Sequence, residues 1–243
     1  MKFIFAFLSL IFFVSCQVTE TIIINRDGSG TIEVEQFRYE NSYMQLAGEE
    51  YSKENVFQDT TYVFKDYIHK YNENFLKYKP DEKELFQKYA DVKAHIKRSS
   101  YEKEFRTVFS LHFNKVSDIP DLYKTEDYAS DIQHNYALTA ENHYFKIAYD
   151  FDGTIFKRSV SIISTAELEK AKDDSEKFLA KYGSSNLMQS YILKYHFPRK
   201  IKSVSNAQAS ISADKKSLTF QFKLADCLKN PEDTNLEVIL DKD

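Results

Sequence analysis

The chain of 243 residues contains no tryptophan, only five glycines and only two cysteines. So few glycines leave little of the backbone freedom that a phosphate-binding loop or an oxyanion hole requires. The sequence has neither a Gly-x-Ser-x-Gly motif nor a glycine-rich phosphate loop, and its six histidines lack the His-Glu-x-x-His spacing of a zinc site. The common signatures of hydrolases, nucleotide-binding proteins and zinc proteases are therefore missing, and we expect no cofactor.

An excess of positive charge is also missing. Thirty-three lysines and arginines stand against 37 acidic residues, which gives a net charge of −4, and the two signs are interspersed along the chain. Because proteins that bind nucleic acids neutralise phosphates with clustered Lys and Arg, we expect no nucleic-acid partner. The main apolar run, at residues 3–15, is shorter than the ~20 residues that a membrane-spanning helix needs.

The start of the chain has the pattern of a secretory signal peptide: Lys2, then the apolar run, then small residues. The tetrad Phe13-Val14-Ser15-Cys16 resembles the lipobox of bacterial lipoproteins, with Phe13 in place of the usual leucine. The resemblance implies that residues 1–15 are removed and that Cys16 is modified with fatty-acyl chains such as palmitate. Residues 16–243 would then form a single α+β domain tethered by lipidated Cys16. The alternative is a plain signal peptide with a chance cysteine.

Lipidation of Cys16 would leave Cys227 without a partner in the chain, because the sequence contains no other cysteine. Cys227 stands in a largely apolar segment, residues 224–228. We therefore expect a buried thiol at this position. The alternative, a reactive nucleophile, would need a nearby base and an electropositive setting.

Tyrosine and phenylalanine are abundant, with 17 and 20 copies, and both favour the pleated surface of a sheet. Alternating apolar residues predict strands, and Asp-Gly pairs at residues 27–28 and 152–153 predict tight hairpin turns between them. The strands that we expect cover residues 19–25, 31–37, 101–113, 136–150, 154–163, 191–197, 207–212, 218–224 and 236–240.

Apolar residues at three- and four-residue steps predict helices. Two of them, at residues 55–79 and 81–96, would form a helical hairpin around Pro80. A further helix is expected at residues 165–182, after the capping box of Ser164 and Glu167, and a short one at residues 225–230. Since strands and helices come in separate groups, the sequence predicts an α+β fold: an antiparallel β-sheet built from hairpins, packed by a helical hairpin and one further helix.

The segment Asp150-Phe151-Asp152-Gly153-Thr154 resembles the first motif of haloacid dehalogenase (HAD)-like phosphohydrolases. The resemblance implies that Asp150 attacks phosphorus, that Asp152 protonates the leaving group and that Mg²⁺ bridges the substrate. A lysine at position 146 interrupts the preceding strand, whereas a central parallel strand should be continuously apolar. A hairpin turn explains the same residues, and we expect no enzyme. Antiparallel pairing of residues 143–150 with 155–163 would decide against the phosphohydrolase.

Residues 25–33 match part of an EF-hand calcium loop. Asn25, Asp27 and Ser29 supply oxygen atoms at alternate positions, and Gly28 and Gly30 accompany them. Position twelve is Gln36, not the bidentate glutamate of that motif. A weak surface Ca²⁺ site and an ordinary tight turn are therefore competing hypotheses, and the turn is favoured.

A series of tyrosines recurs at helical spacing in the expected helical hairpin, at positions 62, 67, 71, 78 and 89. Such a stripe is usually part of the core, and we expect a core here. The alternative is a groove for a lipid or another hydrophobic ligand.

The segments at residues 16–31 and 197–231 resemble parts of small cell-envelope lipoproteins of Bacteroidota type, most of which have no known function. In that lineage, export to the surface is associated with acidic residues soon after the cysteine, and Gln17-Val18-Thr19 lacks them. We therefore expect a binding or scaffolding protein that is anchored in the outer membrane and faces the periplasm. Its partners would be the membrane and an unidentified envelope protein or hydrophobic ligand.

Overall fold

The computed structural model describes residues 16–141, 143–182 and 190–242. Within these residues the chain forms twelve strands, seven α-helices and several short 3-10 turns. The strands are β1 (Cys16–Ile24), β2 (Gly30–Arg38), β3 (Phe57–Val63), β4 (Lys93–Ser99), β5 (Glu104–Phe113), β6 (Phe145–Phe151), β7 (Ile155–Ile162), β8 (Ser190–His196), β9 (Ile201–Val204), β10 (Ser210–Ile211), β11 (Ser217–Lys223) and β12 (Leu236–Leu240). The helices are α2 (Glu40–Ala47), α3 (Phe64–Lys70), α4 (Asn72–Phe75), α5 (Pro80–Gln87), α6 (Thr125–His134), α7 (Thr165–Tyr182) and α8 (Leu224–Lys229).

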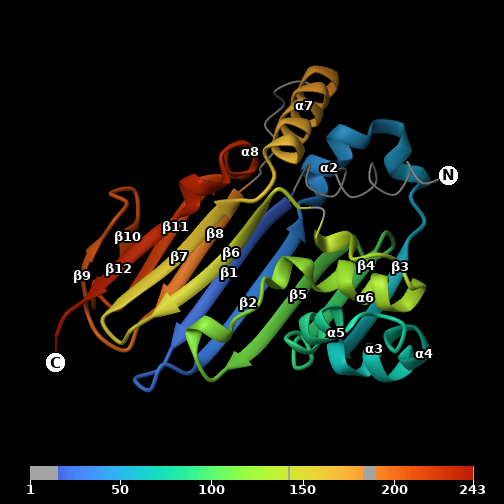
Figure 1. Ribbon diagram of the computed structural model, residues 1–243. Helices are drawn as coiled ribbons and strands as arrows, with labels where there is room; N and C mark the ends of the chain where they lie inside the picture. Colours follow the sequence, from blue (N-terminus) through green and yellow to red (C-terminus); the bar gives the residue numbers. More distant parts are fainter. Residues whose placement is uncertain (1–15, 142, 183–189, 243) are drawn as a thin grey trace.

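Two sheets form the frame of the molecule (Figure 1). The large sheet has the order β10-β11-β8-β1-β2-β5-β4-β3, and the small sheet has the order β6-β7-β12-β9. All pairings are antiparallel except that of β1 with β8. The predicted α+β class with a mainly antiparallel architecture is confirmed.

The small sheet covers part of one face of the large sheet, and α3, α5 and α6 cover the part near β4 and β5 (Figure 1). At the contact between the sheets, the ring of Phe156 on β7 lies 5.2 Å from that of Tyr195 and 5.4 Å from that of Phe197. Under the helices, Phe86 and Tyr89 pack edge-on against Tyr128. One continuous cluster of buried side chains therefore joins both sheets and the helices.

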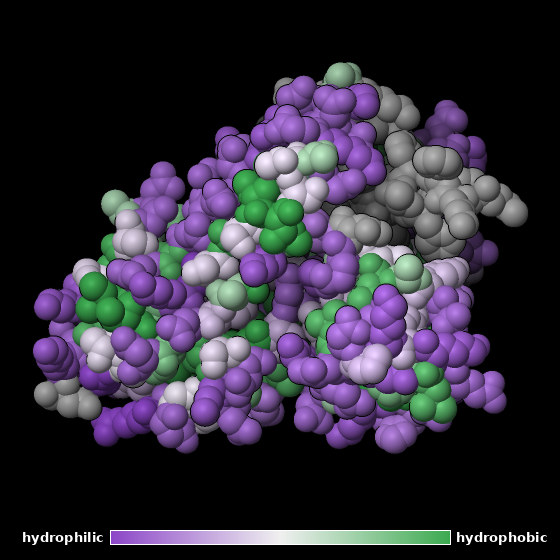
Figure 2. All heavy atoms as spheres, in the orientation of Figure 1, coloured by the Kyte–Doolittle hydropathy of each residue, from purple (hydrophilic) through white to green (hydrophobic). Residues whose placement is uncertain are grey.

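The surface shows no single apolar band on the side that Figure 2 presents. Hydrophilic side chains predominate there, and hydrophobic residues gather in separate patches, one of them where α7 meets the sheets (Figure 2). The amphipathic α7 keeps Leu168 at 6% exposure, which agrees with the predicted helix over residues 165–182.

Both predicted hairpins are present. β1 pairs antiparallel with β2, and β6 pairs antiparallel with β7, each around an Asp-Gly turn. Gly28 and Gly153 have φ angles of +83° and +93°, a region that residues with a Cβ rarely adopt. The predicted strand over residues 136–150 is shorter than expected, because β6 begins at Phe145.

The expected helical hairpin needs correction. Helices do occur before and after Pro80, at residues 64–75 and 80–87. However, β3 replaces the first part of the predicted helix 55–79, and β4 replaces the last part of the predicted helix 81–96. Val92, Ala94 and Ile96 are all buried, so the true period is two. The four-residue step from Val92 to Ile96 fits a strand as well as a helix. The segment forms a strand because its backbone hydrogen-bonds to β3 and β5 on either side.

Three elements were not expected from the sequence. The polar connection at residues 114–133 contains most of α6, which buries Tyr128, Ala129 and Ile132. Residues 38–52, for which the sequence predicted no strand or helix, contain α2 and most of a 3-10 turn, and β9 was not predicted either. α6 buries its residues against α3 and α4, so its apolar face depends on partners far away in the sequence.

Candidate functional site

Cys16 is the first residue of β1, and its backbone lies opposite Arg38 of β2. The next residue is also held: the side-chain oxygen of Gln17 accepts a hydrogen bond from the hydroxyl of Tyr39 at 2.8 Å. The first strand was expected to begin at residue 19, but residues 16–18 already belong to β1. The backbone of Cys16 therefore lies at the end of the large sheet.

Arg38 organises this end of the sheet. Its side chain is 4% exposed, and its guanidinium group donates two hydrogen bonds of 2.9 Å to Glu54 and one of 2.6 Å to Glu40. The same guanidinium lies over the rings of Tyr43 and Phe105, 3.8 and 3.2 Å from their centroids. Although burial lowers the pKa of Arg38, hydrogen bonds and charges from the two glutamates raise it, and the net direction is upward. Segment 40–54 is thereby clamped onto the strand ends.

Asp150 and Asp152 lie on the second hairpin. Asp150 is exposed near the end of β6, opposite Lys157 of β7. Asp152 lies in the turn, where one carboxylate oxygen accepts the backbone N–H groups of Thr154 and Ile155, both at 2.7 Å. These two hydrogen bonds are the leading causes that lower the pKa of Asp152. The carboxylate therefore closes the turn.

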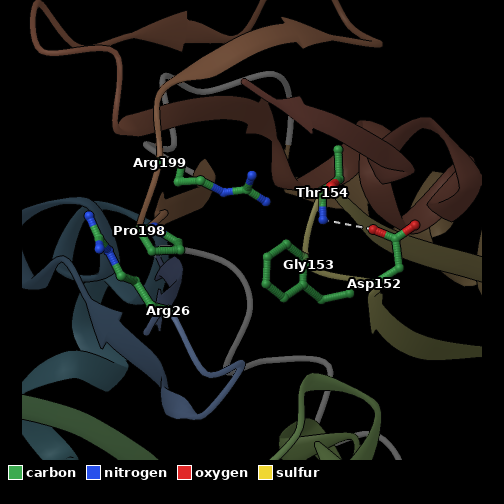
Figure 3. Close-up of a pocket in the computed structure, with 7 residues that line it drawn as sticks. Arg26, Asp152, Gly153, Thr154, Pro198 and Arg199 are labelled. Carbon is green, nitrogen blue, oxygen red and sulfur yellow. Dashed lines mark hydrogen bonds between the residues drawn. The ribbon is translucent and has the colours of Figure 1, made fainter. Parts of the chain in front are cut away.

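This geometry contradicts the phosphohydrolase alternative. β6 is the edge strand of the small sheet and pairs antiparallel with β7, whereas the HAD motif requires the end of a parallel strand. Asp152, Arg26 and Arg199 are among the residues that line a hollow of about 300 Å³, and the carboxylate of Asp152 points toward Thr154 (Figure 3). Arg199 donates to the backbone oxygen of Asp241 at 2.9 Å.

The candidate calcium ligands form a turn network of their own. Asp27 accepts the backbone N–H of Ser29 at 3.0 Å and its hydroxyl at 2.6 Å, and these bonds lower the pKa of Asp27. Asn25 donates its side-chain amide to the hydroxyl of Ser29 at 3.0 Å. The oxygen atoms thus serve the hairpin turn. Among the described residues, no group of three or more His, Cys, Asp or Glu side chains is arranged to hold a metal.

The tyrosine stripe is part of the core. Tyr62, Tyr78 and Tyr89 are 8%, 8% and 2% exposed, and Tyr67 and Tyr71 pack against the same cluster. The hydroxyl of Tyr78 donates to backbone oxygens of Asp131 and Tyr136, both at 2.7 Å. Tyr62, Tyr78 and Tyr89 therefore belong to the core, as expected, and the hydrophobic-ligand alternative stays a prediction.

Cys227 is buried on α8 with 8% exposure, as the sequence predicted. Burial raises the pKa of its thiol to about 12, so the reactive thiolate form is disfavoured near neutral pH.

A buried ionic cluster that the sequence reasoning missed lies between the two sheets. Glu20 of β1 and Arg158 of β7 are 0% and 2% exposed, and the Nε of Arg158 lies 3.2 Å from a carboxylate oxygen of Glu20. Arg158 also donates to the hydroxyl of Thr234 at 2.8 Å and to that of Tyr191 at 2.6 Å. The cluster therefore ties the large sheet to the small one.

Tyrosine hydroxyls complete the coordination of Glu20. Tyr123 and Tyr191 each donate at 3.1 Å, and Tyr195 donates to the other carboxylate oxygen. Burial acts to raise the pKa of Glu20, but the charge of Arg158 and the hydrogen bonds outweigh it, so the net pKa is lowered. Glu20 therefore stays ionised inside the protein, and its charge is matched by that of Arg158.

A sequence signal for this cluster did exist. Val18, Ile22 and Ile24 alternate on one face of β1, and Glu20 occupies the same face. Likewise, Arg158 stands between Phe156 and Val160 on the buried face of β7. A charged residue in an apolar alternation indicates a buried pair, but the pattern cannot name the partner 138 positions away.

No family model matches the chain, and no curated protein matches its sequence. Among solved structures, the NMR structure of the folded domain of LppM from Mycobacterium tuberculosis is similar, with a TM-score of 0.34 and 9% sequence identity. The similarity covers 94% of this chain and 91% of that chain. A similarity of this size assigns neither a family nor an activity. No helix in the described part of the chain is long and apolar enough to cross a membrane.

Proposed function

We propose that the protein is a bacterial lipoprotein, anchored by acyl chains on Cys16, that acts as a binding or scaffolding domain in the cell envelope. We place the protein in the outer membrane, facing the periplasm, because the residues after Cys16 lack the acidic side chains of a surface-export signal. The proposal includes membership of the small cell-envelope lipoproteins of Bacteroidota type that the sequence resembles.

The observation that carries this proposal is the position of Cys16. In sequence, it ends the apolar segment and the lipobox-like tetrad 13–16. In the fold, it is the first residue of β1. Cleavage before Cys16 would therefore remove none of the described strands or helices and would place the acylated residue at the end of a paired strand.

The described polar side chains support a binding or scaffolding role. Glu20 and Arg158 are enclosed between the sheets, and Asp152 and Asp27 close hairpin turns. Each of these groups contributes to the frame. A rigid two-sheet domain fixed at the membrane is suited to holding a partner at a defined place.

Replacement of the anchor cysteine tests the proposal. Cys16→Ser should abolish labelling of the protein by radioactive palmitate and shift it from the membrane fraction to the soluble fraction. Several acyl chains are needed for stable anchoring, so complete loss of acylation should release the domain.

Cys227→Ser is the matched control, because it removes the other cysteine while leaving the lipobox-like tetrad intact. This variant should keep both the label and the membrane location. Cys16→Ser protein that stays in the membrane fraction, or that still incorporates palmitate, would refute the lipid anchor at Cys16.

A further inference from the structure

The strand register places Cys16 at the same end of the large sheet as the start of β3. Cys16 of β1 lies opposite Arg38 of β2, and Phe37, which precedes Arg38, lies opposite Arg106 of β5. Further along the sheet, Ser99 of β4 lies between Glu104 of β5 and Phe57 of β3. The order β1-β2-β5-β4-β3 puts four strand spacings between Cys16 and Phe57. At ~4.8 Å per spacing, the two residues are about 19 Å apart along the sheet end.

An exposed hydrophobic surface occupies the far corner of this end. Val56, Phe57 and Tyr101, which we call the aromatic edge, are 38%, 65% and 70% exposed. They are neighbours in space, because the backbone oxygen of Val56 accepts the N–H of Ser100 at 2.9 Å and the Tyr101 hydroxyl donates to the side chain of Asn55. Phe57 and Tyr101 are the two most exposed aromatic residues of the described chain.

The contacts of Arg38 fix the segments beside the aromatic edge. The Arg38 clamp holds Glu54, two residues before Val56, and packs on Phe105 at the start of β5. Figure 1 shows α2, which belongs to the clamped segment, beyond the end of β2 at which Cys16 lies. The distance between Cys16 and the aromatic edge is therefore set by the sheet and by this clamp.

The charges beside the aromatic edge are mostly paired. The ammonium group of Lys97 lies 5.7 Å from the ring centroid of Phe57, and it is bound to Asp59 at 2.9 Å and to Glu102. Lys53, at the end of the clamped segment, pairs with Glu50 at 2.6 Å. This surface therefore has no excess of positive charge, and any affinity for lipid rests on its aromatic and aliphatic side chains.

We propose that the aromatic edge rests in the headgroup layer of the membrane that holds Cys16, so that the domain stands on the bilayer with this end of the large sheet down. The inference rests on the proposed lipid anchor. Since β1 is paired from Cys16 onward, no free backbone separates the acyl chains from the sheet. The anchored strand end must lie at the bilayer surface, and exposed Phe and Tyr side chains favour that interface.

The absence of tryptophan from the chain offers a direct test, because a single introduced tryptophan is the only one. The lipidated full protein carrying Phe57→Trp is reconstituted in vesicles of equal parts phosphatidylethanolamine and phosphatidylglycerol, with some acyl chains brominated. Ile23→Trp is the matched control, since Ile23 is 45% exposed and lies near the other end of the same strand as Cys16. Seven residues of strand put it ~23 Å away.

The bromines should quench the fluorescence of Phe57→Trp at least about twofold more than that of Ile23→Trp, because interfacial side chains reach ~5–10 Å into the headgroup and acyl boundary. Flotation of the vesicles is measured on the same samples. Protein that fails to float would refute the lipid anchor, and this inference with it. Floating protein with equal or absent quenching would overturn only the inference. A third outcome is that the fluorescence of Phe57→Trp shifts to the blue in native envelope fragments while the bromines in the vesicles do not quench it. That result would place a protein partner on the aromatic edge and would also overturn the inference.

Discussion

Glu20 and Arg158 show how one charged residue is accommodated on each apolar face. Transfer of an isolated charge out of water is strongly unfavourable, so such a residue is stable inside a protein only when it is paired and hydrogen-bonded. The structure satisfies both conditions, since Arg158 faces Glu20 and the hydroxyls of Tyr123, Tyr191 and Tyr195 donate to the carboxylate. The tyrosines that surround the pair also belong to the aromatic core.

Removal of one member of this pair should destabilise the protein severely. Arg158→Met leaves Glu20 buried between the sheets without its countercharge, and we expect the free energy of unfolding to fall by about 3–5 kcal/mol. Urea denaturation followed by circular dichroism measures this loss. The double variant Glu20→Leu/Arg158→Met should lose less than Arg158→Met alone, because no uncompensated charge remains.

Lys157 provides the matched control for Arg158. It precedes Arg158 on β7 and pairs with Glu237 at 3.0 Å, and the two side chains of this ion pair are both about half exposed. Lys157→Met should change the free energy of unfolding by less than about 1 kcal/mol, since exposed ion pairs contribute little. If both variants lost the same free energy of unfolding, the buried ion pair would stabilise the fold no more than the exposed one.

At the scale of elements, the hairpins were predictable and the segment 55–96 was not. A hairpin carries its own signal, because Asp-Gly and the alternating residues around it are close in sequence. β3 and β4 carry no such local signal: Val92 and Ile96 fit two periods, and pairing with β5 decides between them. α6 is similar, since its buried residues Tyr128 and Ile132 acquire their role only by packing on segments far away in the sequence, such as Phe86 and Tyr89.

The first hairpin depends on Gly30 for a steric reason that differs from that of Gly28. A Cβ at Gly30 would overlap the backbone oxygen of Ile23 and lie 2.7 Å from Cζ of Phe113, whereas nothing lies within 4 Å of a Cβ at Gly28. Gly30→Ala should lower the free energy of unfolding by about 1–3 kcal/mol through overpacking.

Gly28→Ala, with φ +83° but open space, should lower the free energy of unfolding only by about 1–2 kcal/mol of backbone strain. Thermal melting of both variants measures the two effects. The expected losses of the two variants overlap, so a second substitution, Phe113→Leu, is needed to tell the two causes apart. Combined with Gly30→Ala, it should restore some of the lost stability. Combined with Gly28→Ala, it should restore none. Rescue in neither background would contradict a contribution of Phe113 to the clash at Gly30 and would leave the overlap with the backbone oxygen of Ile23 as its cause.

At the scale of the whole molecule, the two sheets share one core. Phe156 packs on Tyr195 and Phe197, Arg158 binds Glu20, and one buried cluster runs through both sheets. Neither sheet can bury its apolar face alone, so both should unfold together.

Tryptophan reporters on the two sheets test this cooperativity. Ile23→Trp reports on β1, and Ile163→Trp reports on the end of β7; the two isoleucines are 45% and 47% exposed. Their fluorescence transitions in urea should have the same midpoint, and that midpoint should match the one from circular dichroism. Separate midpoints would show that the small sheet opens independently.

The sequence by itself determined what depends on neighbouring residues: the lipobox-like start at Cys16, the Asp-Gly hairpins, α7 and the α+β class. Turn geometry and local periodicity act over a few residues, so they can be recognised without a structure. Tertiary structure alone decided that β3 and β4 replace parts of the predicted helices, that the Asp152 hairpin lies at the edge of the small sheet, and that Glu20 meets Arg158. It also brought Phe57 and Tyr101 to the Cys16 end of the large sheet, because strand pairing joins segments that are far apart in the chain.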